Sequence, residues 1–151
     1  MRIDRSVMLG ASAESAFSMV DDLGRYPQWM DLVHGVAELP PTVAGARVWD
    51  VELRAQVGPF ARSKRLRMAR TLHEAPHRVV FERSEVDGRH HSVWLLESTV
   101  EPATDASVRL SMSLTYGGNL WAGAVLERVL DDHVERGAAA LAAQLAATDH
   151  R

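Results

Sequence analysis

The feature that most constrains the fold is a change of hydrophobic period near Gly117. Before this point apolar and polar residues alternate in several segments, most clearly at 49–57, where every odd position is apolar. A period of two is typical of strands with one buried face. After Gly117, apolar residues recur at a spacing of 3.6 residues, which predicts one amphipathic helix of about seven turns. The sheet therefore precedes one long terminal helix.

The remaining segments complete an α+β order. Residues 3–9 alternate as a strand, and Ser12 is a suitable N-cap for a helix that closes by Gly24. Pro27 suits the first turn of a second short helix ending near Val33. Helices at two points with all strands between them predict an α+β fold with an antiparallel sheet of about six to seven strands. The strands after the short helices are expected at 36–41, 47–57, 62–72, 79–86, 90–100 and 108–116, with a tight hairpin turn at Asp87–Gly88.

Length and composition set further limits. The chain has 151 residues, a net charge of −3 and no cysteine, which suits one domain without disulfides, cysteine–zinc sites or a thiol nucleophile. The slightly acidic balance argues against wholesale nucleic-acid binding. No apolar run reaches the ~18 residues of a membrane span, and the N-terminus lacks the pattern of a secretory signal. We therefore expect a cytoplasmic protein without an integral membrane segment.

The segment from Ala11 to Trp29 carries a family pattern. It reads ASAESAF at 11–17 and DLGRYPQW at 22–29, and it resembles the opening of the START-like, or SRPBCC, superfamily in its polyketide cyclase/dehydrase branch. The Gly58-Pro59-Phe60 turn and the long terminal helix also resemble that branch, so that residues 1–151 are similar to a single START-like domain.

The resemblance implies a helix-grip fold. In this fold a curved antiparallel sheet wraps around the long C-terminal helix, and two short helices follow the first strand. It also implies an internal cavity for a hydrophobic ligand. The superfamily includes lipid and sterol carriers, plant hormone receptors, polyketide aromatase/cyclases, coenzyme Q-binding proteins and ribosome-associated toxins, among which the fold alone does not choose.

Apolar strand faces and the apolar helix stripe supply the candidate ligand contacts, because space between a sheet and a helix is where such pockets form. The facing of the 90–100 strand stays open, since Val93, Trp94 and Leu95 are consecutive apolar residues. The candidate ligand-binding residues are Trp49, Val51, Leu53, Leu66, Met68, Arg70, Phe81, Trp94, Leu110, Met112, Leu114, Tyr116, Leu126, Leu130 and His133.

Two of these residues are the weak candidates for catalysis. Arg70 shares the parity of the apolar positions on its strand, and a buried guanidinium needs a partner. That partner is either a carboxylate such as Glu82, which we favour, or an acid group of the ligand. His133 lies on the apolar stripe of the long helix, where an imidazole usually packs but is also the best acid–base candidate in the chain.

Other histidine patterns and the basic run favour structural roles. Residues 73–77 match H-E-x-x-H, but Pro76 disrupts the helix that this zinc motif requires, so we expect a turn between strands. His90 and His91 are strand neighbours that point to opposite faces. We therefore predict neither a metal nor a cofactor. The basic run at 62–70 reads as a solvated strand face.

Three functions remain open. The first is the binding or transport of a hydrophobic molecule such as a lipid, isoprenoid or polyketide, with Arg70, Tyr116 and His133 as possible polar anchors. The alternative is an aromatase/cyclase-like enzyme that folds a reactive chain and uses Arg70 and His133 as acid–base groups. The third and weaker hypothesis is a toxin-like protein that contacts the ribosome through its basic strand.

Overall fold

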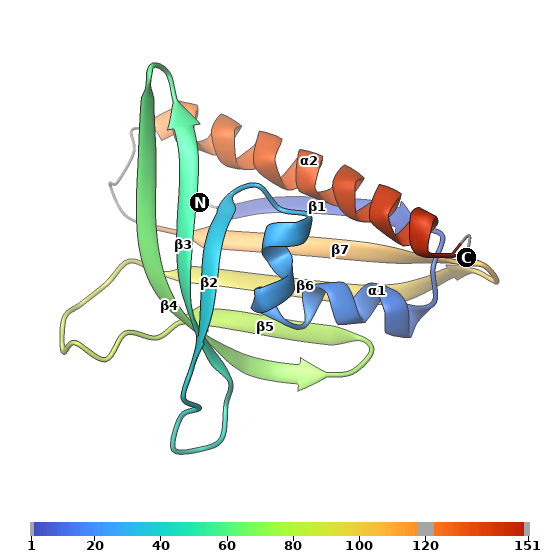
Figure 1. Ribbon diagram of the computed structural model, residues 1–151, viewed down its shortest axis with the longest axis horizontal. Helices are drawn as coiled ribbons and strands as arrows, with labels where there is room; N and C mark the ends of the chain where they lie inside the picture. Colours follow the sequence, from blue (N-terminus) through green and yellow to red (C-terminus); the bar gives the residue numbers. More distant parts are fainter. Residues whose placement is uncertain (1, 118–122, 150–151) are drawn as a thin grey trace.

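The described residues form one seven-stranded antiparallel sheet with the order β1-β7-β6-β5-β4-β3-β2 (Figure 1). This computed structural model describes residues 2–117 and 123–149, without the side chains of 57, 123–127, 129–130 and 148–149. The elements are β1 (Arg2–Leu9), α1 (Ala13–Val20), η1 (Leu23–Gln28), β2 (Val33–Leu39), β3 (Val48–Val57), β4 (Phe60–Glu74), β5 (Arg78–Arg83), β6 (Trp94–Thr104), β7 (Ser107–Tyr116) and α2 (Gly123–Asp149). The α+β helix-grip prediction is confirmed. No helix in the described ranges is both long and apolar enough to cross a membrane.

Capping residues fix the two short helices. The Ser12 hydroxyl accepts a hydrogen bond from the Ser15 amide (3.1 Å) and begins α1 as predicted. The second helix differs from the prediction, because the Asp22 carboxylate caps η1 and accepts from the Gly24 amide (2.8 Å). Pro27 consequently lies near the end of this helix, not at its start. Val33 already belongs to β2, where it pairs with β3.

Two aromatic residues tie η1 to α1. The Tyr26 hydroxyl donates to the Val20 carbonyl (2.9 Å), and the Trp29 indole donates to the Met19 carbonyl (3.2 Å). Both acceptors lie in the last turn of α1, where carbonyls lack partners within the helix. The two side chains thus satisfy α1 and hold η1 against it.

The β5–β6 connection is a ten-residue loop, and the predicted tight turn at Asp87–Gly88 is wrong. The Asp87 carboxylate bonds the Arg89 amide (3.0 Å) and the His91 ring (2.8 Å), which folds the loop on itself. The Arg83 guanidinium at the end of β5 bonds Glu85 (2.9 Å) and Ser92 (3.2 Å). These side-chain bonds replace the strand ladder that a two-residue hairpin would continue.

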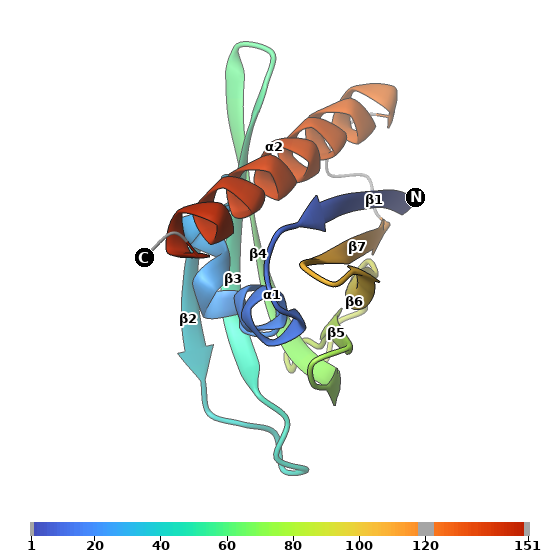
Figure 2. The ribbon, with the colours of Figure 1, turned by 90° about the vertical axis from the view of Figure 1, so that its right-hand side faces the viewer.

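Helix α2 crosses the open side of the curved sheet (Figure 2). It packs against β1, the end of β3 and α1, and buries Val134, Ala138, Leu141 and Leu145. Arg5 interrupts the apolar pattern of β1, and the structure accounts for this, since its guanidinium pairs with Asp131 of α2. One ion pair therefore joins the first strand to the last helix.

Gly137 lets α2 approach the segment after η1. A Cβ atom at this position would lie 2.8 Å from Met30 Cε and 3.4 Å from the Trp29 carbonyl oxygen. The first separation is well inside van der Waals contact, and Met30 is itself buried at 4% exposure. The absent side chain therefore leaves room for the end of Met30, which a larger residue would displace, and the Trp29 carbonyl oxygen limits any closer approach.

We expect Gly137→Val to lower the free energy of unfolding by about 1–3 kcal/mol, because the added methyls overpack the crossing. The loss should occur although valine has the higher helix propensity. Urea denaturation measures it. Ala140→Val, on an exposed position of the same helix, is the matched control and should change stability little. Equal or greater stability of the Gly137 variant would show that α2 is not held at this distance.

Candidate functional site

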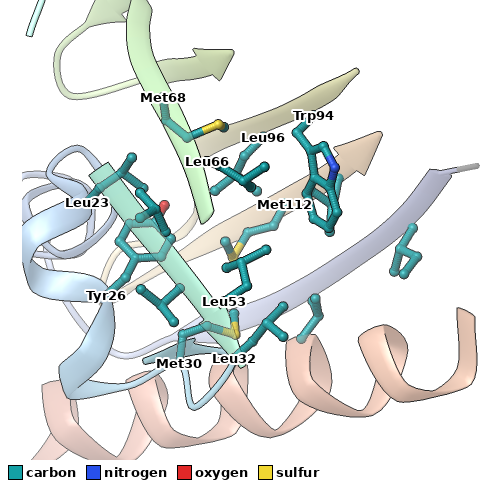
Figure 3. A pocket seen from close by; sticks show the side chains of 15 residues that line it. Leu23, Tyr26, Met30, Leu32, Leu53, Leu66, Met68, Trp94, Leu96 and Met112 are labelled. Atoms are coloured by element: carbon teal, nitrogen blue, oxygen red, sulfur yellow. The ribbon is translucent and has the colours of Figure 1, made fainter. Parts of the chain in front are cut away.

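An apolar cavity lies between the concave face of the sheet, η1 and α2 (Figure 3). Its volume is about 70 Å³, measured as the space available to the centre of a water molecule. Figure 3 shows side chains from η1, the segment after it, and β3, β4, β6 and β7 converging on it. The lining residues are Ile3, Leu23, Tyr26, Met30, Leu32, Val33, Val51, Leu53, Leu66, Met68, Trp94, Leu96, Met112, Leu114 and Val134.

Strand register aligns the sheet side of this wall. Val51 pairs with Leu66 across β3 and β4, and Leu96 pairs with Leu114 across β6 and β7. Because paired residues in an antiparallel sheet point to the same face, each pair places two apolar side chains side by side. Trp94 is two residues before Leu96 and also lines the cavity. This settles the facing of β6: its even positions face the cavity.

The described wall carries only two polar side-chain groups. The Tyr26 hydroxyl already donates to Val20, and burial raises the pKa of this phenol far above its usual range. It is therefore neutral under ordinary conditions and is not a ready acid–base group. The Trp94 indole N–H is buried and has no hydrogen-bond partner among the described residues. The described part of the wall holds no carboxylate, imidazole, amine or guanidinium.

Methionines make the wall adaptable. Met30, Met68 and Met112 line the cavity, and the close-up shows two of their sulfur atoms near its centre (Figure 3). A thioether chain has three rotatable bonds and fills irregular space at low cost. The cavity as it stands has a volume of about 70 Å³, whereas pockets for small-molecule ligands enclose about 300–1,000 Å³. Rotation of these side chains is the means by which a larger ligand would find room.

Seven of the predicted ligand contacts lie in the wall. They come from β3, β4, β6 and β7. Alternation identified those on β3, β4 and β7, whereas the facing of the β6 residue Trp94 was left open. Contact between them and a ligand stays a prediction. These residues are Val51, Leu53, Leu66, Met68, Trp94, Met112 and Leu114.

Other predicted contacts pack behind the wall. Trp49 and Phe81 meet edge to face with ring centroids 5.5 Å apart, and Phe81 also meets the ring of the wall residue Tyr26 edge to face at 6.3 Å. The Tyr116 and Trp94 rings pack with their centroids 5.4 Å apart. Leu110 is fully buried but does not line the cavity. The side chains of Leu126 and Leu130 lie outside the described residues.

Arg70 does not pair with Glu82, the partner favoured for it from the sequence. Its guanidinium donates to the Asp21 carbonyl at the end of α1 (3.1 Å), outside the cavity wall. Glu82 pairs with Ala69 in the β4–β5 register and so lies on the opposite face from Arg70. Parity was correct in placing Arg70 on the concave side, but α1 covers that end of β4.

His133 lies on α2 outside the cavity wall and is partly exposed. Burial, followed by the nearby Arg136 guanidinium, lowers the pKa of this imidazole below its usual value, whereas Asp31 and Asp132 act in the opposite direction. Arg136 also donates to its Nδ1 at 3.3 Å. His133 is therefore a neutral imidazole at pH 7 with one nitrogen already engaged.

The histidine motif at 73–77 is a strand end and a turn, as predicted. His73 is the penultimate residue of β4, stacks on Phe17 of α1 at 5.6 Å and bonds the Asp21 carboxylate at 3.0 Å. Pro76 follows a cis peptide bond in the turn before β5. Within the described residues, no group of three or more histidines and carboxylates is close enough to hold a metal ion.

The remaining wall residues were missed from the sequence. Ile3, Leu96 and Val134 follow the same periodicities as the residues that were identified, so a fuller reading of β1, β6 and α2 could have found them. Leu23, Tyr26, Met30, Leu32 and Val33 gave no periodic signal. They line the cavity because the hydrogen bonds of Tyr26 and Trp29 fold η1 over one end of it.

Solved structures share this architecture. A START superfamily protein from Mycobacterium smegmatis is 19% identical, with a TM-score of 0.75 over 97% of this chain and 98% of that one. A protein from Thermus thermophilus is 15% identical, with a TM-score of 0.74 over 98% and 99% of the two chains. The di-domain ARO/CYC StfQ from the steffimycin biosynthetic pathway is 12% identical, with a TM-score of 0.70 over 99% of this chain and 52% of that one.

At these identities the structural matches establish the fold. No curated protein matches the chain. A family model described as polyketide cyclase / dehydrase and lipid transport matches residues 1–146, which is nearly the whole sequence. The chain therefore belongs to the polyketide cyclase/dehydrase and lipid-transport family of the START-like superfamily.

Proposed function

We propose that this protein binds a hydrophobic small molecule in the cavity between the sheet and α2, and carries it within the cytoplasm. The observation that supports the proposal is the chemistry of the wall: its described part is apolar except for the Tyr26 hydroxyl, which is already bonded, and the Trp94 indole N–H. Such a wall offers affinity through burial of apolar surface, at about 25 cal/mol per Å². It offers no group in the described part that would take part in proton transfer.

The expected ligand is a lipid, isoprenoid or polyketide-like molecule. Val51, Leu53, Leu66 and Met68 on one side, and Trp94, Met112 and Leu114 on the other, are the contacts we propose. Adaptable methionines on both sides favour an elongated or irregular apolar shape over one rigid outline. The family description, which includes lipid transport, supports this class of ligand.

Leu53→Phe tests the site. Leu53 lines the cavity, and the larger ring should fill part of it, weakening uptake of the fluorescent probe N-phenyl-1-naphthylamine by about tenfold or more. Titration of probe fluorescence gives the Kd, and native mass spectrometry of fresh protein reports any lipid that co-purifies. Leu95→Phe is the matched control, because Leu95 lies on the opposite face of β6 and should leave the Kd unchanged. Equal effects of the two variants, or no uptake by the unmodified protein, would refute the proposal.

The alternative is an aromatase/cyclase-like enzyme. The family description and the similarity to an ARO/CYC protein support it, whereas the positions of Arg70 and His133 outside the wall speak against the acid–base pair we predicted.

If Arg70 and His133 do catalyse ring closure, their replacement by alanine should abolish turnover of a linear polyketide thioester analogue, followed by chromatography. The loss of a general acid or base typically lowers a rate 10²–10⁴-fold. We expect no turnover by the unmodified protein. Turnover that survives both substitutions would establish an enzyme that works without these residues.

A further inference from the structure

The hairpin of β3 and β4 extends well beyond the body of the protein (Figure 1). β4 has 15 residues and β3 has 10, and the two stay paired from Val48 with Ala69 out to Val57 with Phe60. The inner part of this ribbon supplies cavity wall, including Leu53 and Leu66. Its outer part, residues 54–65, is called the hairpin tip here. The proposed ligand binding in the cavity does not explain why this part extends so far.

The hairpin tip is strongly basic. It contains Arg54, Arg62, Lys64 and Arg65 and no acidic residue, in a protein whose net charge is −3. Arg65 makes a long ion pair with Asp50 (3.8 Å), lies opposite Glu52 in the β3–β4 register and remains highly exposed. Arg54, Arg62 and Lys64 form no salt bridge with any described residue, although the charge of Glu85 acts on Lys64. The outer cations Arg54 and Arg62 are therefore not neutralised by an ion pair within the described part of the chain.

An exposed aromatic residue lies at the end of this basic ribbon. The turn passes through Gly58, whose φ of +61° suits glycine, and Pro59 into Phe60. The Phe60 side chain is 63% exposed, and the Arg62 guanidinium lies over its ring at 5.9 Å. An exposed apolar ring next to the hairpin turn, with the Arg62 guanidinium over it, presents hydrophobic and cationic groups to the same partner.

We propose that the hairpin tip docks on an anionic lipid bilayer. Clustered basic residues are attracted to the negative surface of such a membrane, and an aromatic ring enters its interfacial region. Single-stranded RNA is the less suited partner, because it needs aromatic platforms along a basic groove, and Phe60 is the lone aromatic residue of the tip. Docking of this kind is a property beyond ligand binding. Because β3 and β4 also form part of the cavity wall, a docked tip would hold the cavity close to the bilayer, which is a source of apolar ligands.

Vesicle flotation tests the inference with the full chain. We expect binding to vesicles that contain roughly one-third phosphatidylserine in phosphatidylcholine, and little binding to phosphatidylcholine alone or at high salt. Each arginine near such a surface strengthens partitioning about fivefold, so R54Q/R62Q/R65Q should weaken it on the order of 100-fold. Phe60→Ser should also weaken binding, but without changing its salt dependence. Thermal melting shows whether each variant is folded.

The matched control removes three exposed arginines elsewhere. R25Q/R89Q/R109Q makes the same change in net charge and should retain most of the vesicle binding. If both triple variants lost vesicle binding equally, the total charge of the protein, and not the hairpin tip, would explain binding, and the proposal would be overturned. So would binding of a single-stranded RNA oligonucleotide, but not of vesicles, in a manner that depends on the tip.

Insertion of the tip has its own readout. In F60W, the added tryptophan should be quenched by brominated phosphatidylserine vesicles more than the four native tryptophans of the unmodified protein. Absence of any extra quenching would mean that the tip stays in water. Leu53→Phe separates this proposal from the carrier function, because blocking the cavity should leave vesicle binding unchanged.

Discussion

A curved sheet with one apolar face must keep that face from water, and everything else in this protein follows from how the face is covered. Helix α2 covers one end, with Val134, Ala138 and Leu141 buried beneath it. Because a straight helix cannot fill the hollow of a curved sheet, a second element has to close the remainder. The segment 23–33 does so, and the side chains of the two covers stop short of filling the interior. The cavity is the space left by that mismatch.

The segment 23–33, which closes the second part of the sheet's hollow, is held in place by hydrogen bonds from its side chains. Tyr26 and Trp29 reach back to carbonyls in the last turn of α1, while Arg70 from β4 reaches the next carbonyl, at Asp21. Carbonyls at the end of one short helix thus accept hydrogen bonds from three side chains, two from η1 and its C-cap and one from β4. Arg70 was a candidate site residue from the sequence, but its guanidinium is used in this structural contact. The polar atoms of Tyr26 and Trp29 are likewise used to hold the segment 23–33 over the cavity.

Sequence periodicity predicted most of the sheet and helix, because alternation and 3.6-residue spacing record which face of an element is buried. Val51, Leu53, Leu66 and Met112 were found in this way. Periodicity could not place Met30 or Leu32, which line the cavity through tertiary contacts in a non-periodic segment. It also over-assigned Trp49 and Phe81, since a buried face includes the residues packed behind a wall as well as those in it. Whether a position is odd or even along a strand tells which face of the sheet its side chain is on. Only the packing of the folded protein decides which side chains on that face line the cavity.

Two strands of the sheet, β3 and β4, each contribute both to the cavity wall and to the basic hairpin tip. On β3, Trp49 packs in the core, Leu53 lines the cavity and Arg54 begins the basic tip, all within six residues. On β4 the basic tip comes first, with Arg62, and the cavity residues Leu66 and Met68 follow. A strand that leaves the body of a protein must end the burial of its apolar face, and on β4 it does so where Leu66 gives way to Lys64 and Arg62 on the same face. The proposed membrane contact and the cavity are therefore joined by a continuous, hydrogen-bonded ribbon, so that docking at the tip would orient the cavity with respect to the bilayer.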